Sequence, residues 1–554
     1  MDIKAFIQNI KSRPDFREVV HHEEFPFKEA AYALPSEPLP AELKDALSAS
    51  GIDRLFTHQA FGIDLVLQGK NIVVMTPTAS GKSLIYNIPV LESLLKDPEA
   101  KALYLFPLKG LEQDQLGAFR QLAERLPIYK STEAPKGKRK AFTPGVCEIY
   151  DGDTTAYRRK KIREAPPAVV LTNPDMIHMA INPFHQKWES FFRNLKFVII
   201  DEIHTYRGVF GSHVANVLRR LRRIARLYGS DPVFIACSAT IANPGELAEM
   251  LTGVRFETVT GSGAPQGSRH FLMINPASGI SPYTVATRLF ASSVRAGFKT
   301  IAFTKARKIT ELMHNWINEG YSDISPVVSS YRAGFLPEER REIEKKLFSG
   351  ELSGVVSTSA LELGVDIGGL DVCVLVGYPG TVSSTWQRSG RVGRSGRDSL
   401  IIMVGLADAL DQYFMRNPVD FFRRSSEAAV LDPENRPIVK SHLLCAASES
   451  YIKPNDPVFD TKRLLPALTE LEQEGKLRRG RLDVWFSRKR LPQLEVSIRE
   501  TGHSYSIIVE GGGLLGESSS ARVLYDLHPG AVYLHKGVQY RVVRLDMHER
   551  VAYC

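Results

Sequence analysis

Short apolar runs, each followed by polar or turn-forming residues, recur along the whole chain, and stretches of helical length separate them. Continuous apolar runs are typical of strands buried on both faces, and their alternation with helices is typical of parallel sheets. The first half places such runs at 71–76, 102–106, 169–173, 196–200 and 233–240. The second half places them at 299–304, 325–331, 354–359, 372–379 and 400–406. The pattern predicts an α/β protein with two parallel-sheet units of similar size.

A cluster of Gly, Ser and Pro at 261–267 lies between the two units and predicts a hinge. At roughly 150 residues per domain, a chain of 554 residues is expected to form three or four domains. The expected units are a helical lead-in, two parallel-sheet domains, a winged helix and a small β-rich module, at 1–50, 51–265, 266–428, 429–493 and 494–554.

The last two units depend on shorter patterns. Leu464, Leu468 and Leu471 share one helical face, and the helix is expected to end at Gly475. A basic strand follows, so the winged helix either binds duplex DNA or only braces the fold. The final residues alternate in β fashion and stop inside a strand-like run, so we expect a small module that is truncated at its end.

Composition narrows the class of protein. With 43% hydrophobic and 24% charged residues the chain is typical of soluble globular proteins. A formal net charge of +9 favours a nucleic-acid partner, although a solvated basic surface is the alternative. The N-terminus is charged throughout, and no apolar run approaches the roughly 20 residues of a membrane span. The five cysteines form no CxxC pair, so we expect no disulfide framework, no zinc within this segment and a reducing cytosol.

The strongest chemical motif is the strand at 71–76 with the loop and helix that follow it. Gly81, Lys82 and Ser83 open the helix, which is the arrangement of a phosphate-binding loop. Loop N–H groups and the helix N-terminus would face the anion, Lys82 would reach the β and γ phosphates, and the Ser83 hydroxyl would hold Mg²⁺. Thr76 stands where the first Gly of the pattern is usual, so a chance Gly-Lys-Ser at a helix start is the alternative. The predicted loop residues before Gly81 are Thr78, Ala79 and Ser80.

A second motif is the pair of carboxylates at the end of the strand 196–200. We assign Asp201 to Mg²⁺ and Glu202 to the attacking water, because neighbouring residues at a strand end point in different directions. Ser238 and Thr240 end another buried strand, where a simple turn is the alternative. Gln59 lies about 20 residues before the phosphate loop, so its amide is predicted to read the adenine edge.

The second unit carries two further motifs. Gly364 and Asp366 lie in a predicted turn that we assign to ATP binding, and Gln387, Arg391 and Arg394 belong to the run QRSGRVGRSGR. The two arginines are three residues apart and face one way on a helix or tight turn, so they suit a γ-phosphate. A basic loop that binds RNA or DNA is the alternative.

Two basic stretches remain open in meaning. Residues 129–145 are expected to form an exposed loop, either a solvated insertion or a nucleic-acid contact. Residues 213–229 are expected to form a helix whose arginines face solvent or, less favoured, nucleic acid.

The order of motifs resembles superfamily 2 helicases: THQ, PTASGKS, PLKGL, TNPDMIH, DEIH, SAT, FTKARK, STSALELGVDIG and QRSGRVGRSGR follow one another over roughly residues 40–420. The resemblance implies two RecA-like domains with ATP bound between them, and this family tolerates Thr76. It also implies that Gln387, Arg391 and Arg394 act across the cleft, and that His204, Ser238 and Thr240 couple hydrolysis to movement. The implied nucleic-acid contacts are Pro107, Lys109, Thr172, Asn173, Thr304, Lys305, Ser357 and Thr358.

A narrower resemblance, over nearly the whole chain, is to the RecQ-like Hrq-type helicases and their bacterial relatives in mitomycin-damage repair. It is carried by LPAELKDALSASGIDRLFTHQA, DEIHTYRGVFGSHVANVLRRLRR, YRAGFLPEERREIE and HPGAVYLHKGVQYRVVRLD. It implies ATP-driven 3′→5′ movement on single-stranded DNA or a 3′-tailed duplex, in DNA repair in the bacterial cytosol. The family usually continues into a four-cysteine zinc domain, for which no matching cysteines exist here.

Other interpretations remain beside this one. An RNA helicase or a duplex translocase that separates no strands would share every motif. A nucleic-acid-binding scaffold with a silent ATPase belongs to another class, and intact Lys82, Glu202, Arg391 and Arg394 argue against it. We expect no membrane partner and a monomer, with room for a nuclease partner.

Overall fold

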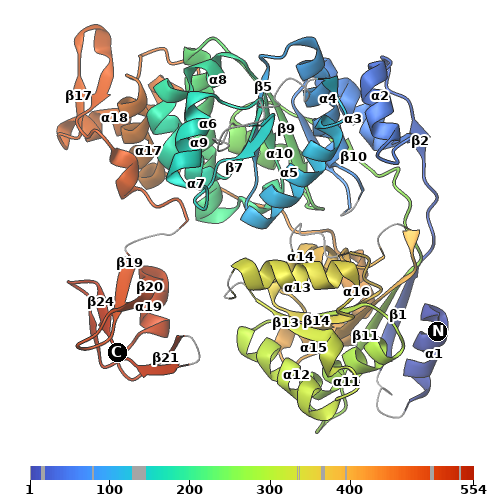
Figure 1. The fold of residues 1–554 in the computed structure, drawn as a ribbon. Helices are drawn as coiled ribbons and strands as arrows, with labels where there is room; N and C mark the ends of the chain where they lie inside the picture. The colour runs from blue at the N-terminus through green and yellow to red at the C-terminus, as the bar shows by residue number, and fades with distance from the viewer. Residues whose placement is uncertain are drawn as a thin grey trace, which may run out of the picture.

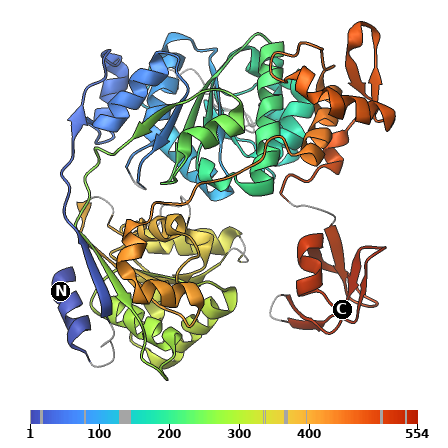
Figure 2. The same cartoon turned by 180° about the vertical axis from the view of Figure 1, so that it is seen from behind.

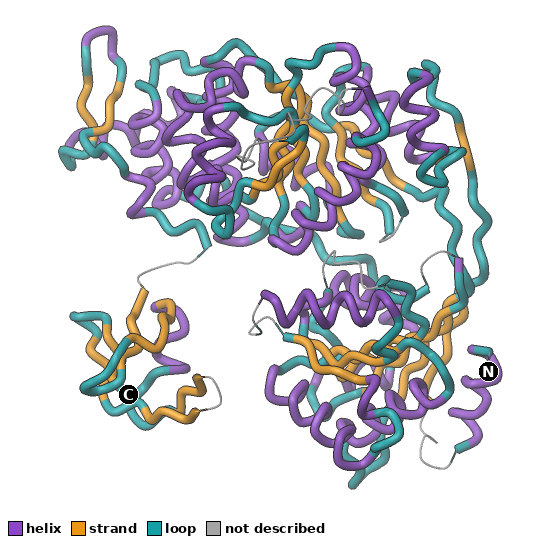
Figure 3. Tube along the Cα trace, viewed as in Figure 1, coloured by secondary structure: helices purple, strands orange, loops and turns teal. Residues whose placement is uncertain are grey.

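The computed structural model describes residues 2–13, 19–77, 80–127, 145–332, 335, 337–362, 368–393, 396–499, 504–535 and 538–554. Several predicted site residues lie outside these ranges, as does most of the basic stretch at 129–145: they are Thr78, Ala79, Gly364, Asp366 and Arg394. Two large lobes make up most of the chain, and helices cover both faces of the strands in each (Figure 3).

The upper lobe in Figure 1 is built on a sheet of seven parallel strands in the order β10-β4-β9-β8-β5-β7-β6. Successive residues of one strand point to opposite faces of the sheet, so Val73 packs into one apolar cluster and Val74 into the other. The strands are β4 (Ile72–Met75), β5 (Lys101–Leu105), β6 (Cys147–Ile149), β7 (Val169–Thr172), β8 (Leu195–Ile200), β9 (Val233–Ser238) and β10 (Glu257–Thr260).

Helices on both faces of this sheet make its central strands inaccessible to water, which is why their sequences are continuous apolar runs. They are α2 (Ala41–Ser48), α3 (Thr57–Leu67), α4 (Ser83–Lys96), α5 (Lys109–Ala123), α6 (Ala156–Glu164), α7 (Pro174–Met176), η3 (Ile177–Ile181), η4 (Asn182–Trp188), α8 (Glu189–Arg193), η5 (Ile203–Thr205), α9 (Gly208–Leu227) and α10 (Pro244–Thr252).

The lower lobe has a second seven-stranded sheet, in the order β1-β11-β16-β15-β12-β14-β13. Its strands are β1 (Val19–Phe25), β11 (Arg269–Ile274), β12 (Thr300–Phe303), β13 (Val328–Tyr331), β14 (Gly354–Ser357), β15 (Val372–Val376) and β16 (Ser399–Val404). Its helices are α1 (Ile3–Ser12), α11 (Pro282–Arg295), α12 (Arg307–Gly320), η6 (Ser325–Val327), α13 (Pro337–Ser349), η7 (Ser359–Leu361), α14 (Val382–Ser389), α15 (Ala409–Arg416) and α16 (Pro418–Arg423).

The first 25 residues differ from the expected lead-in to the first domain. Strand β1 pairs antiparallel with β11 at the edge of the second sheet, and α1 buries Phe6, Ile7 and Ile10 in the core of that lobe. Both segments therefore belong to the lower lobe, beside which the N-terminus lies in Figures 1 and 2.

Two chain segments cross side by side between the lobes, and we call residues 26–33 with 261–267 the interdomain strap (Figure 2). It continues the β1·β11 ladder. Lys28 and Gln266 exchange backbone hydrogen bonds of 2.9 and 3.0 Å, and the Ala31 N–H donates to the Gly263 carbonyl at 2.8 Å. Strand β2 (Tyr32–Ala33) then pairs with β3 (Leu55–Phe56) in front of α3. The predicted hinge is thus a paired ribbon.

After the second lobe the chain returns to the first. Helices α17 (Arg436–Glu449) and α18 (Thr461–Gln473) precede a hairpin of β17 (Leu477–Arg479) and β18 (Trp485–Ser487), with η9 (Arg481–Asp483) at its turn and η10 (Pro492–Glu495) after it. Leu468 and Leu471 are buried, Leu464 packs against the same core, and Gly475 adopts the left-handed backbone expected after a helix end.

Three of the five arginines of α9 are buried, and for these side chains both interpretations of 213–229 were wrong. Arg220, Arg222 and Arg223 are buried, and α17 packs along α9. Arg220 donates to the carboxylate of Glu449, and Arg223 pairs with Asp456 at 2.6 Å. We call α17 and α18, with the segment between them, the two-helix unit. These ion pairs connect it to the first lobe.

The last unit is a four-stranded sheet in the order β20-β19-β24-β23, with one helix and a separate two-stranded ribbon. Its elements are β19 (Ser504–Ile508), β20 (Leu514–Ser519), α19 (Ser520–Asp526), β21 (Val532–His535), β22 (Val538–Arg541), β23 (Arg544–Asp546) and β24 (Val551–Tyr553). Ile507, Val523 and Leu527 form part of its own small core.

Candidate active site

The predicted phosphate loop lies where β4 ends and α4 begins. Lys82 Nζ donates to the carbonyls of Thr76 at 3.1 Å and Ser238 at 3.2 Å, so the ammonium group spans the ends of β4 and β9. Thr76, which replaces the usual Gly, shares a hydrogen bond of 2.6 Å with the Ser80 hydroxyl and closes the loop. Ser83 is the first residue of α4. A phosphate at this position would take over the donors of Lys82 from the two carbonyls.

Gln59 supports this loop. The Phe56 N–H donates to its Oε1 and its Nε2 donates to the Gly81 carbonyl, both at 2.9 Å, and the side chain is buried. Gly81 has a φ of +76°, and a Cβ there would lie 2.5 Å from Gln59 Nε2, so the position requires glycine. Both ends of the amide are engaged within the protein, and contact of Gln59 with adenine stays a prediction.

Asp201 and Glu202 follow β8 directly and are both nearly buried. Burial, and then the charge of Glu202, raise the pKa of Asp201 to about 7. Glu202 has a φ of +50°, an uncommon conformation for a residue other than glycine. Backbone strain of this kind clusters at functional sites, and here it turns the second carboxylate away from the line of the strand.

The pair fits a magnesium ion on chemical grounds. Two adjacent buried carboxylates repel one another, and a divalent cation would remove that repulsion. The Ser83 hydroxyl and the carboxylate of Asp201 are oxygen ligands of the type that Mg²⁺ prefers. Among the described residues, no cluster of three or more His, Cys, Asp or Glu is placed to hold a metal ion. This absence does not bear on a site that mixes protein and phosphate oxygens.

His204 joins the acid pair to the end of β9. The Ala239 N–H donates to its Nδ1 at 3.2 Å, and burial lowers the pKa of the ring, so His204 is neutral. The Oε2 of Glu202 lies 3.5 Å from the same Nδ1, a contact between two acceptors and not an ion pair. His204 Nε2 and Ser238 Oγ are buried and lack a hydrogen-bond partner within the described ranges.

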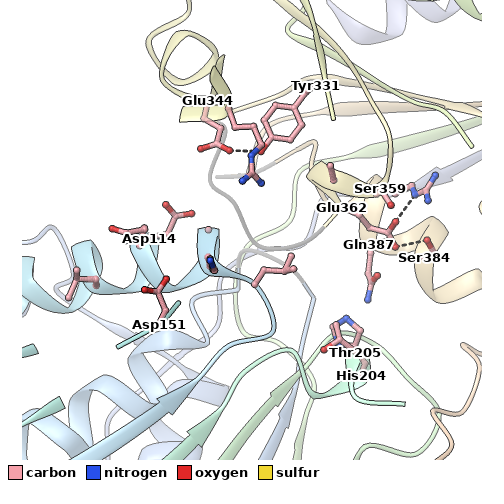
Figure 4. Close-up of a pocket in the computed structure, with 18 of the residues that line it drawn as sticks. Asp114, Asp151, His204, Thr205, Tyr331, Glu344, Ser359, Glu362, Ser384 and Gln387 are labelled. Atoms are coloured by element: carbon pink, nitrogen blue, oxygen red, sulfur yellow. Dashed lines mark hydrogen bonds and ion pairs between the residues drawn. The ribbon is translucent and has the colours of Figure 1, made fainter. Parts of the chain in front are cut away.

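The two lobes meet across a cleft of about 1610 Å³. Figure 4 shows His204 and Thr205 on one side, with Gln387, Ser384 and Glu362 opposite them. Ser383 Oγ on α14 donates to the Thr240 carbonyl at 3.1 Å, a direct contact between the lobes. The cleft therefore brings His204 and Thr205, which follow the acid pair, and Ile241, which follows β9, close to the first turns of α14.

On the far side of the cleft, Glu362 organises α14. It accepts from Ser384 Oγ at 2.5 Å and from Arg388 Nε at 2.9 Å. Arg391 donates to the Glu362 carbonyl from Nε at 3.2 Å and Nη2 at 2.7 Å and is only 1% exposed. Gln387 and Arg388 line the cleft. The γ-phosphate role of Arg391 stays a prediction, and Arg388 is a cleft residue that the sequence did not single out.

The protein residues predicted to contact nucleic acid lie at or just after the ends of β-strands. Most are buried: Pro107, Thr172, Asn173, Thr304 and Ser357. The Thr358 side chain accepts from the Ala360 N–H.

Lys109 and Lys305 are held by carboxylates. Lys109 pairs with Asp153 at 2.6 Å, and Lys305 pairs with Asp408 at 2.7 Å and Asp411 at 3.0 Å. A bound backbone phosphate would compete with these carboxylates for the two ammonium groups.

Glu112 supports the loop ends and was missed by sequence reasoning. It is fully buried on α5, and Asn173 Nδ2 donates to its Oε1 at 3.1 Å. Asn173 in turn accepts from the Met176 N–H at 3.1 Å and so caps α7. Burial is the main reason that the pKa of Glu112 is raised to about 8. The protonated acid therefore predominates at neutral pH.

This pKa predicts a pH effect on stability. The unfolded chain releases the Glu112 proton near pH 4.5, whereas the folded chain keeps it up to about pH 8, so the free energy of unfolding falls as pH rises between these values. Glu112→Gln preserves the acceptor and removes the titration. We expect equal melting temperatures for variant and wild type below about pH 4 and a more stable variant at pH 8.5, measured by thermal unfolding. Parallel pH profiles for the two proteins would contradict the assignment.

Among the described residues, no helix is both long enough and apolar enough to span a membrane. Cys147, Cys237, Cys373 and Cys445 are buried free thiols, and Cys554 is half-buried.

Comparison with known families agrees with this geometry. Residues 56–247 match the DEAD/DEAH box helicase model, and residues 283–396 match the helicase conserved C-terminal domain model. The first match covers strands β4 to β9 of the upper sheet, and the second covers β12 to β15 of the lower sheet. The RecA-like fold predicted for both domains is confirmed.

Full-length similarity extends further. The chain is 43% identical to the uncharacterized ATP-dependent helicase YprA of Bacillus subtilis, over all of this chain and 73% of YprA. It is 33% identical to the ATP-dependent helicase HRQ1 of Saccharomyces cerevisiae, over 99% of this chain but only 52% of HRQ1.

Among solved structures, the DUF1998 helicase MrfA bound to DNA and AMPPNP superposes with a TM-score of 0.85 at 42% identity, over all of this chain and 76% of MrfA. The Mycobacterium smegmatis helicase Lhr, at 22% identity and a TM-score of 0.65, shares the fold over 83% of this chain and 62% of Lhr. The chain thus belongs to the family of ATP-dependent helicases that includes YprA and HRQ1.

Proposed function

We propose that this helicase moves 3′→5′ along single-stranded DNA and acts in DNA repair. The observation that carries the proposal is the cleft, which sets His204 and Thr205, directly after the acid pair of one RecA-like lobe, opposite Gln387 and Arg388 of the other. The similarity to MrfA, solved with DNA and AMPPNP, supports DNA as the track. Within this proposal residues 51–265 and 266–428 are the motor, 429–493 a winged helix and 494–554 a small β module.

The chemistry follows from the side chains. Lys82 would bind the β and γ phosphates, and Glu202 would accept the proton of the water that attacks the γ-phosphorus, while the bond to the ADP oxygen breaks. Mg²⁺ held by Ser83 and Asp201 would neutralise phosphate charge during this step. ATP contacts both lobes only when they close, so hydrolysis and product release would open the cleft.

Movement along DNA requires that the two lobes bind the DNA strand tightly in turn. The ends of β5 and β7 in the first lobe and of β12 and β14 in the second carry the predicted contacts. Lys109 and Lys305 supply positive charge, one in each lobe. His204, Ser238 and Thr240 lie between the acid pair and α14, where they would couple ATP hydrolysis to movement of the other lobe.

A helicase assay with tailed substrates tests direction and track. We expect ATP-dependent unwinding of a duplex with a 3′ single-stranded DNA tail, and none for the matched 5′-tailed or blunt duplex. The same duplex with an RNA tail separates a DNA motor from an RNA helicase. Preference for the 5′ tail would overturn the polarity, and activity on RNA tails alone would overturn the choice of DNA.

A further inference from the structure

His58 lies between the phosphate loop and the interdomain strap. It is in the first turn of α3 and 4% exposed. The Gly263 N–H donates to its Nδ1 at 3.2 Å, and its Nε2 donates to the Ser80 carbonyl at 3.0 Å. Since an N–H only donates and a carbonyl only accepts, the ring is neutral with its proton on Nε2. One buried side chain therefore bonds to the loop on one edge and to the strap on the other.

The strap is pressed closely against α3 at this point. A Cβ on Gly263 would lie 2.4 Å from Thr57 Oγ1 and 2.5 Å from the Ala31 carbonyl, so only glycine fits there. The Thr57 N–H also donates to the Ala31 carbonyl at 3.0 Å. The strap cannot shift here without moving the first turn of α3, which carries His58.

The opposite end of the strap is fixed in the second lobe. Its two segments continue into that lobe as the paired strands β1 and β11, in which Phe25 is paired with Arg269. The strap is thus a ribbon of two segments of the same chain, with one end in the second sheet and the other bonded to His58. The residue is 22 positions from Ser80 and 205 from Gly263 in sequence, so only the fold brings the three together.

We propose that His58 is a positioning residue that links the state of the phosphate loop to the interdomain strap, and hence to closure of the two lobes. The inference rests on the proposed function, because it assumes that closure follows nucleotide binding. A shift of the Ser80 carbonyl when phosphate binds or leaves moves Nε2, and the rigid ring passes that shift to Gly263. Gln59 supports the neighbouring Gly81 carbonyl but, among the residues that the structure describes, makes no hydrogen bond to the strap. His58 differs from it in bonding to both.

Two amide substitutions separate the two bonds. The Oδ1 of Asn occupies about the position of Nδ1, so His58→Asn keeps an acceptor for Gly263 and loses the donor to Ser80. The Nε2 of Gln occupies about the position of Nε2, so His58→Gln keeps the donor to Ser80 and loses the acceptor for Gly263. His548→Gln, at a fully exposed ring, is the matched control.

The measurements are the KM for ATP, the ratio of DNA-stimulated to basal turnover, and lobe closure. Closure is followed by energy transfer between dyes at Lys44→Cys and Glu319→Cys, upon addition of single-stranded DNA and a non-hydrolysable ATP analogue. We expect His58→Gln to keep the KM, and to lose about fivefold or more of both the stimulation ratio and the equilibrium constant for closure. His58→Asn should lose the same coupling and also raise the KM.

The result that overturns the inference is a His58→Gln protein that closes and responds to DNA as wild type does, because His58 would then only support the loop. Loss of nucleotide binding together with earlier thermal unfolding in both variants would equally assign it a purely structural role. If wild type shows nucleotide-driven closure but no response to DNA, the proposed track is wrong, while the closure comparison still decides the role of His58.

Discussion

Replacing Glu202 with Gln is expected to lower ATP turnover by about 10²–10⁴-fold while ATP binding is kept. The substitution keeps the shape of the side chain but removes the carboxylate that would accept the proton of the attacking water. It leaves Lys82, Ser83 and Asp201 in place to bind the phosphates. Removing the neighbouring negative charge also lets Asp201 ionise more easily, since that charge helps to raise its pKa.

Steady-state hydrolysis and binding of a fluorescent ATP analogue measure the two effects separately. Glu99→Gln, which changes an exposed carboxylate in the same lobe, should match wild type in both. Near-normal turnover by Glu202→Gln would show that another group activates the water. Loss of nucleotide binding would show instead that Glu202 holds the nucleotide or its metal.

Arg220→Ala is expected to destabilise the first lobe and its two-helix partner by about 3–5 kcal/mol. The carboxylate of Glu449 would remain buried without its guanidinium, which donates to both oxygens. Two neutral imidazoles would lose a donor as well, because Arg220 Nη1 lies 3.0 Å from Nδ1 of both His178 and His442. His178 also donates to the Val496 carbonyl at 3.0 Å, so the effect extends beyond α17.

Arg226→Ala on the same helix is the control. Arg226 is partly exposed and pairs at 3.2 Å with Asp231, whose side chain is 67% exposed, so we expect a loss below about 1 kcal/mol. Thermal unfolding, with hydrogen exchange across α17, measures both variants. Equal small losses would mean that apolar packing between α9 and α17, and not the charged network, holds the unit in place.

The motor itself was largely predictable from the sequence. Strands such as β4 and β8 are short continuous apolar runs that end in polar chemistry, and at the carboxyl ends of parallel strands that chemistry converges. Lys82, Asp201 and Glu202 could therefore be placed together from their positions along the chain. The local sequence is enough to place these motifs because each one directly follows the strand that positions it.

The contacts between distant segments could not be predicted in this way. The α9 arginines look like a solvated basic face until α17, more than 200 residues later, brings Glu449 to meet Arg220. The strand β1 contains two histidines and two glutamates, a poor pattern for a strand of an α/β sheet, and it pairs only at the antiparallel edge. His58 was hidden for the same reason, since its partners Ser80 and Gly263 are far apart in sequence.

We propose that single-stranded DNA is the track that stimulates ATP turnover. The most direct test of this proposal is steady-state ATP hydrolysis without nucleic acid and with single-stranded DNA, duplex DNA or RNA, each at two salt concentrations. We predict strong stimulation by single-stranded DNA that weakens as salt rises, because phosphate contacts release counterions. Stimulation by RNA alone, or turnover indifferent to every nucleic acid, would contradict the proposal.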